Sequence, residues 1–216
     1  ITVKIAPNAL AVVDGVTIEN GAASKTITNI LNVEKIRGGT SGQRGENTLD
    51  LRPYPVAGVS EGLTVEIKMT GSTSQAEVKT NANANANSTL TFENVTSIKG
   101  TQHDDTFKFK SGSLRHGIDS GGNVAGDLLD YSAYGRKVVV DLTKPKNVSV
   151  PDFMTAQGTI TGVKGITHIT GGEKEDKLTG DGGDNILIGN GGEDTLIGGA
   201  GHDTLEGGAG KDTLEG

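Results

Sequence analysis

Apolar residues recur at two spacings along this chain, and neither is the 3.6-residue period of an amphipathic helix. Before residue 171, short runs carry an apolar residue at every third position, as in Phe92, Val95 and Ile98 or in Ile160, Val163, Ile166 and Ile169. After residue 171, one leucine recurs every nine residues, at Leu178, Leu187, Leu196, Leu205 and Leu214. The pattern predicts short strands joined by turns.

Residues 171–216 consist of nine-residue units. In register they are GGEKEDKLT, GDGGDNILI, GNGGEDTLI, GGAGHDTLE and GGAGKDTLE, followed by Gly216. A unit this short has no core of its own and must stack on its neighbours to bury its leucine. The repeat therefore predicts a β-solenoid rather than a separate globular domain.

The positions of each unit differ in chemistry. The sixth holds an oxygen-bearing side chain, namely Asp176, Asn185, Asp194, Asp203 and Asp212. Glycines leave backbone carbonyls unshielded, and those expected to line a metal are Gly180, Gly182, Gly189, Gly191, Gly198 and Gly207. Carboxylates and carbonyls are hard oxygen ligands, and the chain has no cysteine and only four histidines. The combination favours Ca²⁺.

These units resemble the GGxGxDxUx repeats of haemolysin-type, or RTX, secreted proteins. The resemblance implies a parallel β-roll in which two nonapeptides make one turn and each calcium lies between repeat n and repeat n+2. It places Asp176, Asp194 and Asp212 on one edge and Asn185 and Asp203 on the other.

Three residues depart from the repeat pattern. Lys174 replaces the fourth-position glycine of the first unit, which is expected to be a boundary turn. Asp181 and Asn190 replace second-position glycines, and either serve as extra ligands or are solvated loop residues.

Negative charge is concentrated in the same segment. Residues 171–216 hold 11 Asp and Glu against 3 Lys, while the whole chain has a net charge of −7. Without calcium the stacked carboxylates repel one another, and one leucine per nine residues buries little apolar surface. We therefore expect residues 171–216 to fold on calcium and to be loosely ordered without it.

The first 170 residues are a degenerate version of the same pattern. LDLRPY from Leu49 is echoed by LDYSAY from Leu129, and the strand LTVEIK from Leu63 by VVVDLT from Val138. With 34 glycines and only 3% aromatic residues, the composition suits a narrow solenoid core. We expect an all-β chain, with a parallel β-solenoid over 1–170 and a calcium-binding parallel β-roll over 171–216. Long excursions are expected near 71–88 and 144–158.

Single nonapeptide-like units also occur upstream. GTQHDDTFK from Gly100 and GNVAGDLLD from Gly122 place Asp105 and Asp127 at the sixth position. GQRGENTLD from Gly42 places Asn47 there. Asp105 and Asp127 either hold a further calcium or are ordinary turn residues.

Signals for catalysis are weak. The GxSxG match around Ser60 precedes a strand, whereas a nucleophile elbow leads into a helix. The histidines form no HExxH motif, no basic aromatic patch indicates nucleic acid, and no apolar stretch is long enough to span a bilayer. We therefore expect no enzyme.

The chain is similar to segments of large bacterial RTX adhesins that have LDYSxY, then VxVDL, then an aliphatic run entering the nonapeptides. That resemblance implies type I secretion, an extracellular or cell-surface location, and a structural role folded by extracellular calcium. The chain begins without Met and stops inside a sixth unit, so neighbouring modules of a longer protein are expected partners, with a surface or carbohydrate receptor as another candidate. The alternatives are the calcium module of an exported hydrolase or epimerase, and a surface-layer or filament subunit.

Overall fold

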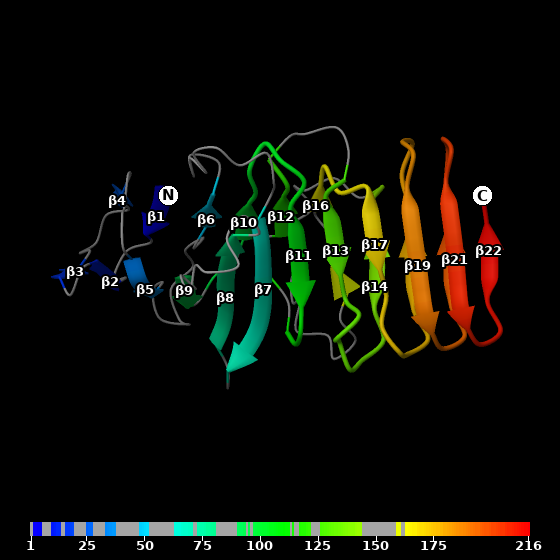
Figure 1. Ribbon diagram of the computed structural model, residues 1–216, viewed down its shortest axis with the longest axis horizontal. Coiled ribbons are helices and arrows are strands. Elements are labelled where there is room, and N and C mark those ends of the chain that lie inside the picture. Colours follow the sequence, from blue (N-terminus) through cyan, green and yellow to red (C-terminus); the bar gives the residue numbers. More distant parts are fainter. Residues whose placement is uncertain are drawn as a thin grey trace.

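The computed structural model describes residues 2–5, 10–13, 16–19, 25–27, 33–37, 48–51, 63–70, 73–80, 90–93, 95, 97–112, 114, 117–121, 126–143, 159–160 and 163–216. All regular elements within these residues are β-strands. A search of the same residues for helices able to cross a membrane finds none. The strands lie side by side along the long axis of the molecule, from β1–β5 at one end to β22 at the other (Figure 1).

Three sheets contain the strands. Sheet A has the order β16 (Val163–Lys164), β12 (Gly117–Asp119), β10 (Ser97–Lys99), β6 (Thr48–Asp50), β1 (Thr2–Ile5) and β4 (Lys25–Ile27). Sheet B has the order β21 (Thr204–Ala209), β19 (Ile186–Gly191), β17 (His168–Thr170), β13 (Leu128–Asp130), β11 (Thr106–Phe109), β7 (Leu63–Thr70), β8 (Thr73–Thr80), β9 (Leu90–Glu93), β5 (Val33–Arg37), β2 (Leu10–Val13) and β3 (Val16–Glu19). Sheet C has the order β15 (Thr159–Ile160), β14 (Val139–Asp141), β18 (Lys177–Thr179), β20 (Thr195–Ile197) and β22 (Thr213–Glu215).

From β17 onward the chain alternates between sheets B and C, and each strand pairs in parallel with the strand one turn away. In sheet C the register aligns Leu178 with Leu196 and Leu196 with Leu214. One turn therefore spans two nonapeptides, which confirms the predicted parallel β-roll. The coil continues upstream through β10, β11, β12 and β13, which alternate between sheets A and B with parallel pairing.

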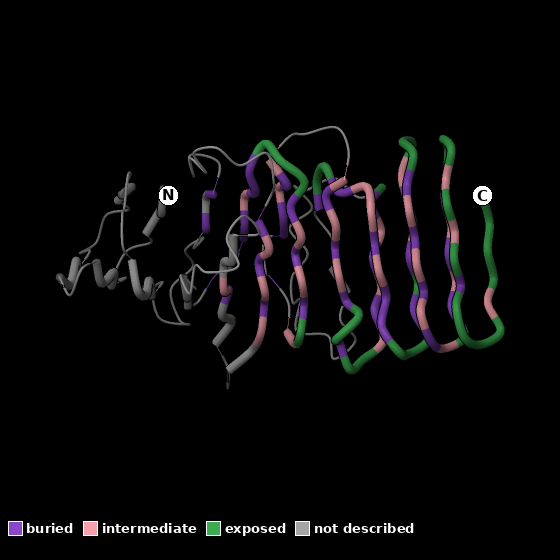
Figure 2. The backbone as a smooth tube through the Cα atoms, in the orientation of Figure 1, coloured by how far each residue is buried: buried purple, intermediate pink, exposed green. Residues whose placement is uncertain are grey.

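In the coil from β6 onward, inward-facing side chains of neighbouring strands align in ladders. In sheet B the ladder consists of Val65, Phe107, Leu129, Ile169, Leu187 and Leu205. In sheet A it consists of Leu49, Ile98, Ile118 and Val163. Along strands such as β11 and β19, buried residues alternate with partly exposed ones, and this alternation is visible in Figure 2.

Aromatic residues enlarge the core only upstream. The rings of Phe109 and Tyr131 stack with centroids 4.8 Å apart, and Tyr134 meets Tyr131 edge-on at 5.6 Å. All three are buried. In the last repeats the core narrows to single leucines, and Leu214 at the end of the coil is 47% exposed.

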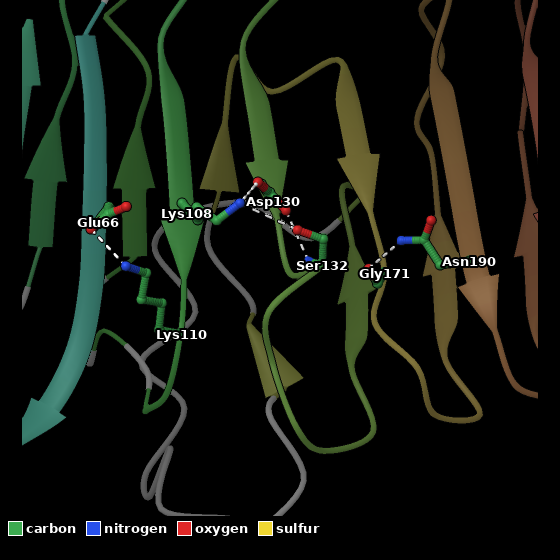
Figure 3. A network of polar contacts seen from close by, with 7 residues as sticks. All are labelled: Glu66, Lys108, Lys110, Asp130, Ser132, Gly171 and Asn190. Carbon is green, nitrogen blue, oxygen red and sulfur yellow. Dashed lines mark hydrogen bonds and ion pairs between the residues drawn. The ribbon is translucent and has the colours of Figure 1, made fainter.

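Ion pairs bridge neighbouring strands of sheet B. Lys108 Nζ lies 2.7 Å from Asp130 Oδ2, and Lys110 Nζ lies 2.9 Å from Glu66 Oε2 (Figure 3). Lys108 and Asp130 are directly opposite in the β11–β13 register. Partly exposed pairs of this kind add little stability, and they favour this register over a slipped one.

Two upstream predictions need correction. The echoed LD motifs lie in different sheets, since Leu49 belongs to β6 in sheet A and Leu129 to β13 in sheet B. The echoed strands that follow also differ, with β7 in sheet B and β14 in sheet C. Every strand of the coil has the same inward–outward alternation, so short motifs recur without structural equivalence.

The excursion predicted near 71–88 contains β8, which forms an antiparallel hairpin with β7. Among the first five strands the pairing is also antiparallel, as in β2–β3 and β1–β4. The excursion predicted at 144–158, Asn47 and Ser60 lie outside the described residues.

Candidate calcium-binding turns

The coil has two edges formed by turns. We call the turns that lead into sheet B the entry edge; they follow β10, β12, β16, β18 and β20. We call the turns that leave sheet B for sheet C the exit edge; they follow β13, β17, β19 and β21. The sixth-position side chains of successive nonapeptides therefore alternate between the two edges.

On the exit edge, carboxylates and backbone amides form a ladder that crosses from turn to turn. The N–H of Asp176 donates to Asp194 Oδ1 at 2.7 Å, and the N–H of Asp194 donates to Asp212 Oδ1 at 2.9 Å. Upstream, the N–H of Val138 donates to Asp176 Oδ1 at 2.7 Å. The structure thus brings Asp176, Asp194 and Asp212 together on one edge, as predicted.

The entry edge has the same ladder with fewer charges. The N–H of Asn185 donates to Asp203 Oδ1 at 2.9 Å. Asn185 Nδ2 also donates to the carbonyl of Thr167 at 3.4 Å, and the N–H of Gly126 donates to Thr167 Oγ1 at 3.1 Å. Thr167, which lies 18 residues before Asn185, therefore occupies a ladder position where a carboxylate stands elsewhere. That spacing was the signal that sequence analysis missed.

The first glycine of each repeat is buried where oxygen atoms converge. A Cβ placed on Gly171 would lie 2.6 Å from Asp176 Oδ2 and 2.7 Å from the Gly189 carbonyl oxygen. The carboxylate of one repeat and the carbonyl of the next turn on that edge therefore approach the same small volume, which we call the cradle. The same pairing of a sixth-position side-chain oxygen and a carbonyl from the next turn occurs at Gly180 and Gly189.

The other glycines singled out in the sequence differ in position. Gly198 and Gly207 lie against the carboxylates of Asp203 and Asp212, respectively. Gly191 faces the carboxylate of Glu173 instead, and nothing lies within 4 Å of a Cβ built on Gly182. The structure therefore brings the first-position glycines, but not Gly182, to the sixth-position side chains. Gly171, which the sequence analysis left out, belongs with them.

Burial without full pairing makes the exit-edge carboxylates electrostatically costly. Asp176 and Asp194 are each 1% exposed. Burial raises the pKa of Asp176 to about 6, and the nearby Asp194 carboxylate adds to this shift. Burial also raises the pKa of Asp194, with Asp212 and Glu175 contributing. Asp194 Oδ2 is buried and has no hydrogen-bond partner within the described residues. A cation at this oxygen would remove the cost.

The second-position side chains form hydrogen bonds of their own. Asn190, which has a positive φ of 75°, donates from Nδ2 to the Gly171 carbonyl at 2.8 Å (Figure 3). Asp181 Oδ1 accepts a bond from the N–H of Gly183 within its own turn at 2.9 Å. Asn190 therefore links two exit-edge turns directly, whereas Asp181 stabilises one entry-edge turn.

The first repeat forms a regular turn despite Lys174. Asp176 accepts from the N–H of Gly172 at 2.7 Å and takes its place in the ladder. The boundary lies one turn upstream, where the buried, apolar Val138 donates to the Asp176 carboxylate. On the exit edge, the ladder position is therefore apolar at Val138 and holds a carboxylate from Asp176 onward.

A sequence family of RTX calcium-binding nonapeptide repeats matches residues 161–196 and 188–216, with four copies. Residues 161–216 are RTX repeats. RTX nonapeptide repeats bind Ca²⁺. No curated protein matches the chain.

The cradles of the RTX segment suit calcium. Within the described residues no group of three His, Cys, Asp or Glu side chains forms a metal site, so an ion here draws on backbone carbonyls as well as carboxylates. Ca²⁺ accepts such mixed oxygen ligands in flexible geometry. The oxygens that converge around Gly171, Gly180 and Gly189 would hold the ion, and bound calcium would supply positive charge to offset the buried carboxylates.

Proposed function

We propose that residues 171–216 are a calcium-folded structural segment of a secreted or cell-surface bacterial protein. The proposed ligands are the sixth-position side chains together with carbonyls of the first-position glycines. On the exit edge they are Asp176, Asp194 and Asp212, and on the entry edge Asn185 and Asp203. The main supporting observation is the cradle, in which a buried carboxylate oxygen and a carbonyl oxygen from the next turn converge.

The structural role follows from the energetics of the coil. Between residues 171 and 216 each strand buries at most one leucine, while the segment carries 11 acidic residues against 3 Lys. Apolar burial alone is too small to order such a chain, so the ions between turns supply the missing stability. Extracellular calcium modules work at about 10⁻⁴–10⁻³ M calcium. A segment of this kind stays loosely ordered where calcium is scarce and folds after export, which suits type I secretion.

The elongated stack favours a spacer role in an adhesin. Each added pair of nonapeptides lengthens the coil by one strand spacing, about 4.8 Å, without enlarging its core. Such a coil holds neighbouring modules apart. The sequence of the full-length protein distinguishes an adhesin from an exported enzyme. Long arrays of further modules would support an adhesin. An adjoining hydrolase or epimerase domain would instead assign these repeats to an exported enzyme.

The calcium dependence is tested by titrating the metal-free chain with Ca²⁺ and following backbone hydrogen exchange. We expect amides within 171–216 to gain strong protection as calcium binds. Asp194→Asn should weaken binding roughly tenfold or more, since calcium affinity follows ligand charge. Glu206→Gln, which removes an exposed carboxylate on β21, is the matched control and should bind as wild type does. Full protection of 171–216 in excess chelator would overturn the proposal.

A further inference from the structure

We propose a further calcium site on the entry edge between Asp105 and Asp127, outside the residues that match the RTX family. It rests on the proposed function, because it assigns to these turns the ion inferred for Asp176 and Asp194. The argument is that the two pairs of aspartates have the same hydrogen-bonding geometry, although they lie on opposite edges.

The upstream members of the two pairs accept the same backbone hydrogen bonds, and Asp105 additionally accepts bonds from the Thr101 hydroxyl, which has no counterpart at Gly172. Asp176 Oδ1 accepts from the N–H of Val138 on the preceding turn, and Oδ2 accepts from Gly172, four residues back. Asp105 Oδ1 accepts from the N–H of Leu63 at 2.7 Å, and Oδ2 accepts from Thr101, also four residues back, at 2.6 Å. Both carboxylates are buried and fixed by backbone amides.

The downstream members correspond as well. Asp194 Oδ1 accepts from the N–H of Asp176, and Asp127 Oδ1 accepts from the N–H of Asp105, each at 2.7 Å. In both residues Oδ2 is buried and has no hydrogen-bond partner among the residues that the structure describes. A buried carboxylate oxygen without a donor is costly, and a cation is the group that satisfies it most strongly.

The cradle is also present. A Cβ on Gly100 would overlap Asp105 Oδ2 and the carbonyl oxygen of Ser120, which lies on the turn of Asp127. This matches the surroundings of Gly171, where Asp176 Oδ2 and the Gly189 carbonyl converge. The buried Ser120 hydroxyl lies near the Asp127 carboxylate and partly offsets the effect of burial on its pKa, but no hydrogen bond of ordinary geometry joins the two groups, so the hydroxyl adds a neutral oxygen to the site.

The chemistry of the site selects a hard cation. The available atoms are carboxylate, carbonyl and hydroxyl oxygens, and the nearby His103 is exposed. Ca²⁺ accepts irregular sets of oxygens, whereas Mg²⁺ requires near-ideal octahedral geometry. The site ends downstream at Thr167, which follows Asp127 on the entry edge and brings no charge.

The test follows hydrogen exchange of the full chain during a Ca²⁺ titration with Mg²⁺ as background. In the wild type, calcium should protect the turn amides of 100–105 and 126–127, which precede β11 and β13, as well as the amides of 171–216. Asp127→Asn keeps an Oδ1 that can accept from the N–H of Asp105 and replaces the unpaired Oδ2 with an amide nitrogen. An asparagine fits this edge of the coil, since Asn185 already occupies a ladder position there. We expect this variant to need roughly tenfold more calcium for the middle amides, with 171–216 unchanged.

Two further variants complete the test. Asp119→Asn, on the strand before the turn, is the control and should behave as wild type. Asp194→Asn should weaken protection of 171–216 and leave the middle amides responsive. If calcium protects 171–216 alone, or if Asp127→Asn responds as wild type does, the middle site is excluded while the proposed function stands. If calcium protects neither region, the proposed function itself fails.

Discussion

The middle coil of residues 97–143 and the RTX repeats of residues 171–216 share one backbone path but differ in what fills it. In the middle, Phe107, Phe109 and Tyr131 are fully or almost fully buried between the sheets. Both regions carry buried aspartates at their edges, but only single leucines fill the interior of the repeats. Apolar burial therefore contributes more to the stability of the middle coil, and the repeats depend more on charge neutralisation at their edges.

This difference has a thermodynamic consequence. Aromatic side chains bury large apolar areas, so the middle coil is favoured by the hydrophobic effect whether or not metal is bound. Burial raises the pKa of carboxyl groups in both regions, but the repeats bury less apolar surface to offset this cost, so their stability depends more on the ligand concentration. Calcium should thus act on one half of the coil far more than on the other.

Removal of calcium by a chelator should produce the largest difference between the two regions. Excess chelator should abolish hydrogen-exchange protection across 171–216 and leave the strands β11 and β13 protected, since their core is aromatic. Circular dichroism should show a corresponding partial loss of β signal, which calcium restores and magnesium does not. Equal loss of protection in both regions would show that the middle coil has no independent stability.

A second, smaller effect concerns the exit-edge carboxylates. Asp194 is bonded to the turns on both sides, whereas the turn upstream of Asp176 presents Val138. If each ion lies between consecutive turns, as proposed, Asp194→Ala should remove about two bound ions and Asp176→Ala about one. Isothermal titration calorimetry measures both, with exposed Glu193→Ala as the control. Equal losses would contradict the placement of one ion between each pair of consecutive exit-edge turns.

Acid should stabilise the fold of the repeats when metal is absent. In the fold the pKa of Asp176 is raised to about 6 from 3.8, chiefly by burial. The folded state therefore holds a proton between pH 4 and 6 that the unfolded state has released, so the unfolding free energy falls as pH rises through this window. Chelated protein should be more ordered at pH 4.5 than at pH 7.

Calcium reverses the role of the ionised carboxylate. Bound metal favours the charged form, so calcium-saturated protein should show no comparable fall in stability between pH 4.5 and 7. Calcium affinity should instead decrease on acidification, as protons compete for Asp176. If chelated protein is equally ordered at both pH values, the buried charge of Asp176 does not destabilise the metal-free fold.

The nonapeptides could be predicted almost completely because their period fixes both register and chemistry. Once Leu178, Leu196 and Leu214 repeat at 18 residues, parallel stacking places Asp176, Asp194 and Asp212 on one edge. The ligand role assigned to them stays a prediction. The hydrogen bonds from backbone amides to their carboxylates could not be foreseen, because they depend on how closely consecutive turns approach.

Upstream, sequence comparison failed where spacing is irregular. Leu49 and Leu129 occupy similar motifs but lie in different sheets, and the strands that follow them differ too, since β7 forms a hairpin with β8 whereas β14 pairs in parallel with β18. Asp105 and Asp127 are 22 residues apart rather than 18, yet they meet through the Asp105 N–H. The strands on either side keep their parallel pairing despite the longer spacing, so local spacing alone does not set the register.

The smallest expected effect comes from the entry edge, where Asn185 stands in line with the aspartates. Asn185→Asp keeps the Oδ1 acceptor for the N–H of Asp181 and loses only the long 3.4 Å bond from Nδ2 to the Thr167 carbonyl. The new carboxylate should strengthen calcium binding with Asp203 several-fold, because affinity rises with ligand charge. It should also weaken the metal-free fold, because it adds a buried charge. Calorimetry with and without chelator measures both changes, and Thr204→Asp adds the same charge on an exposed strand position. Unchanged affinity in Asn185→Asp would show that the entry edge binds its ion through carbonyls and Asp203 alone.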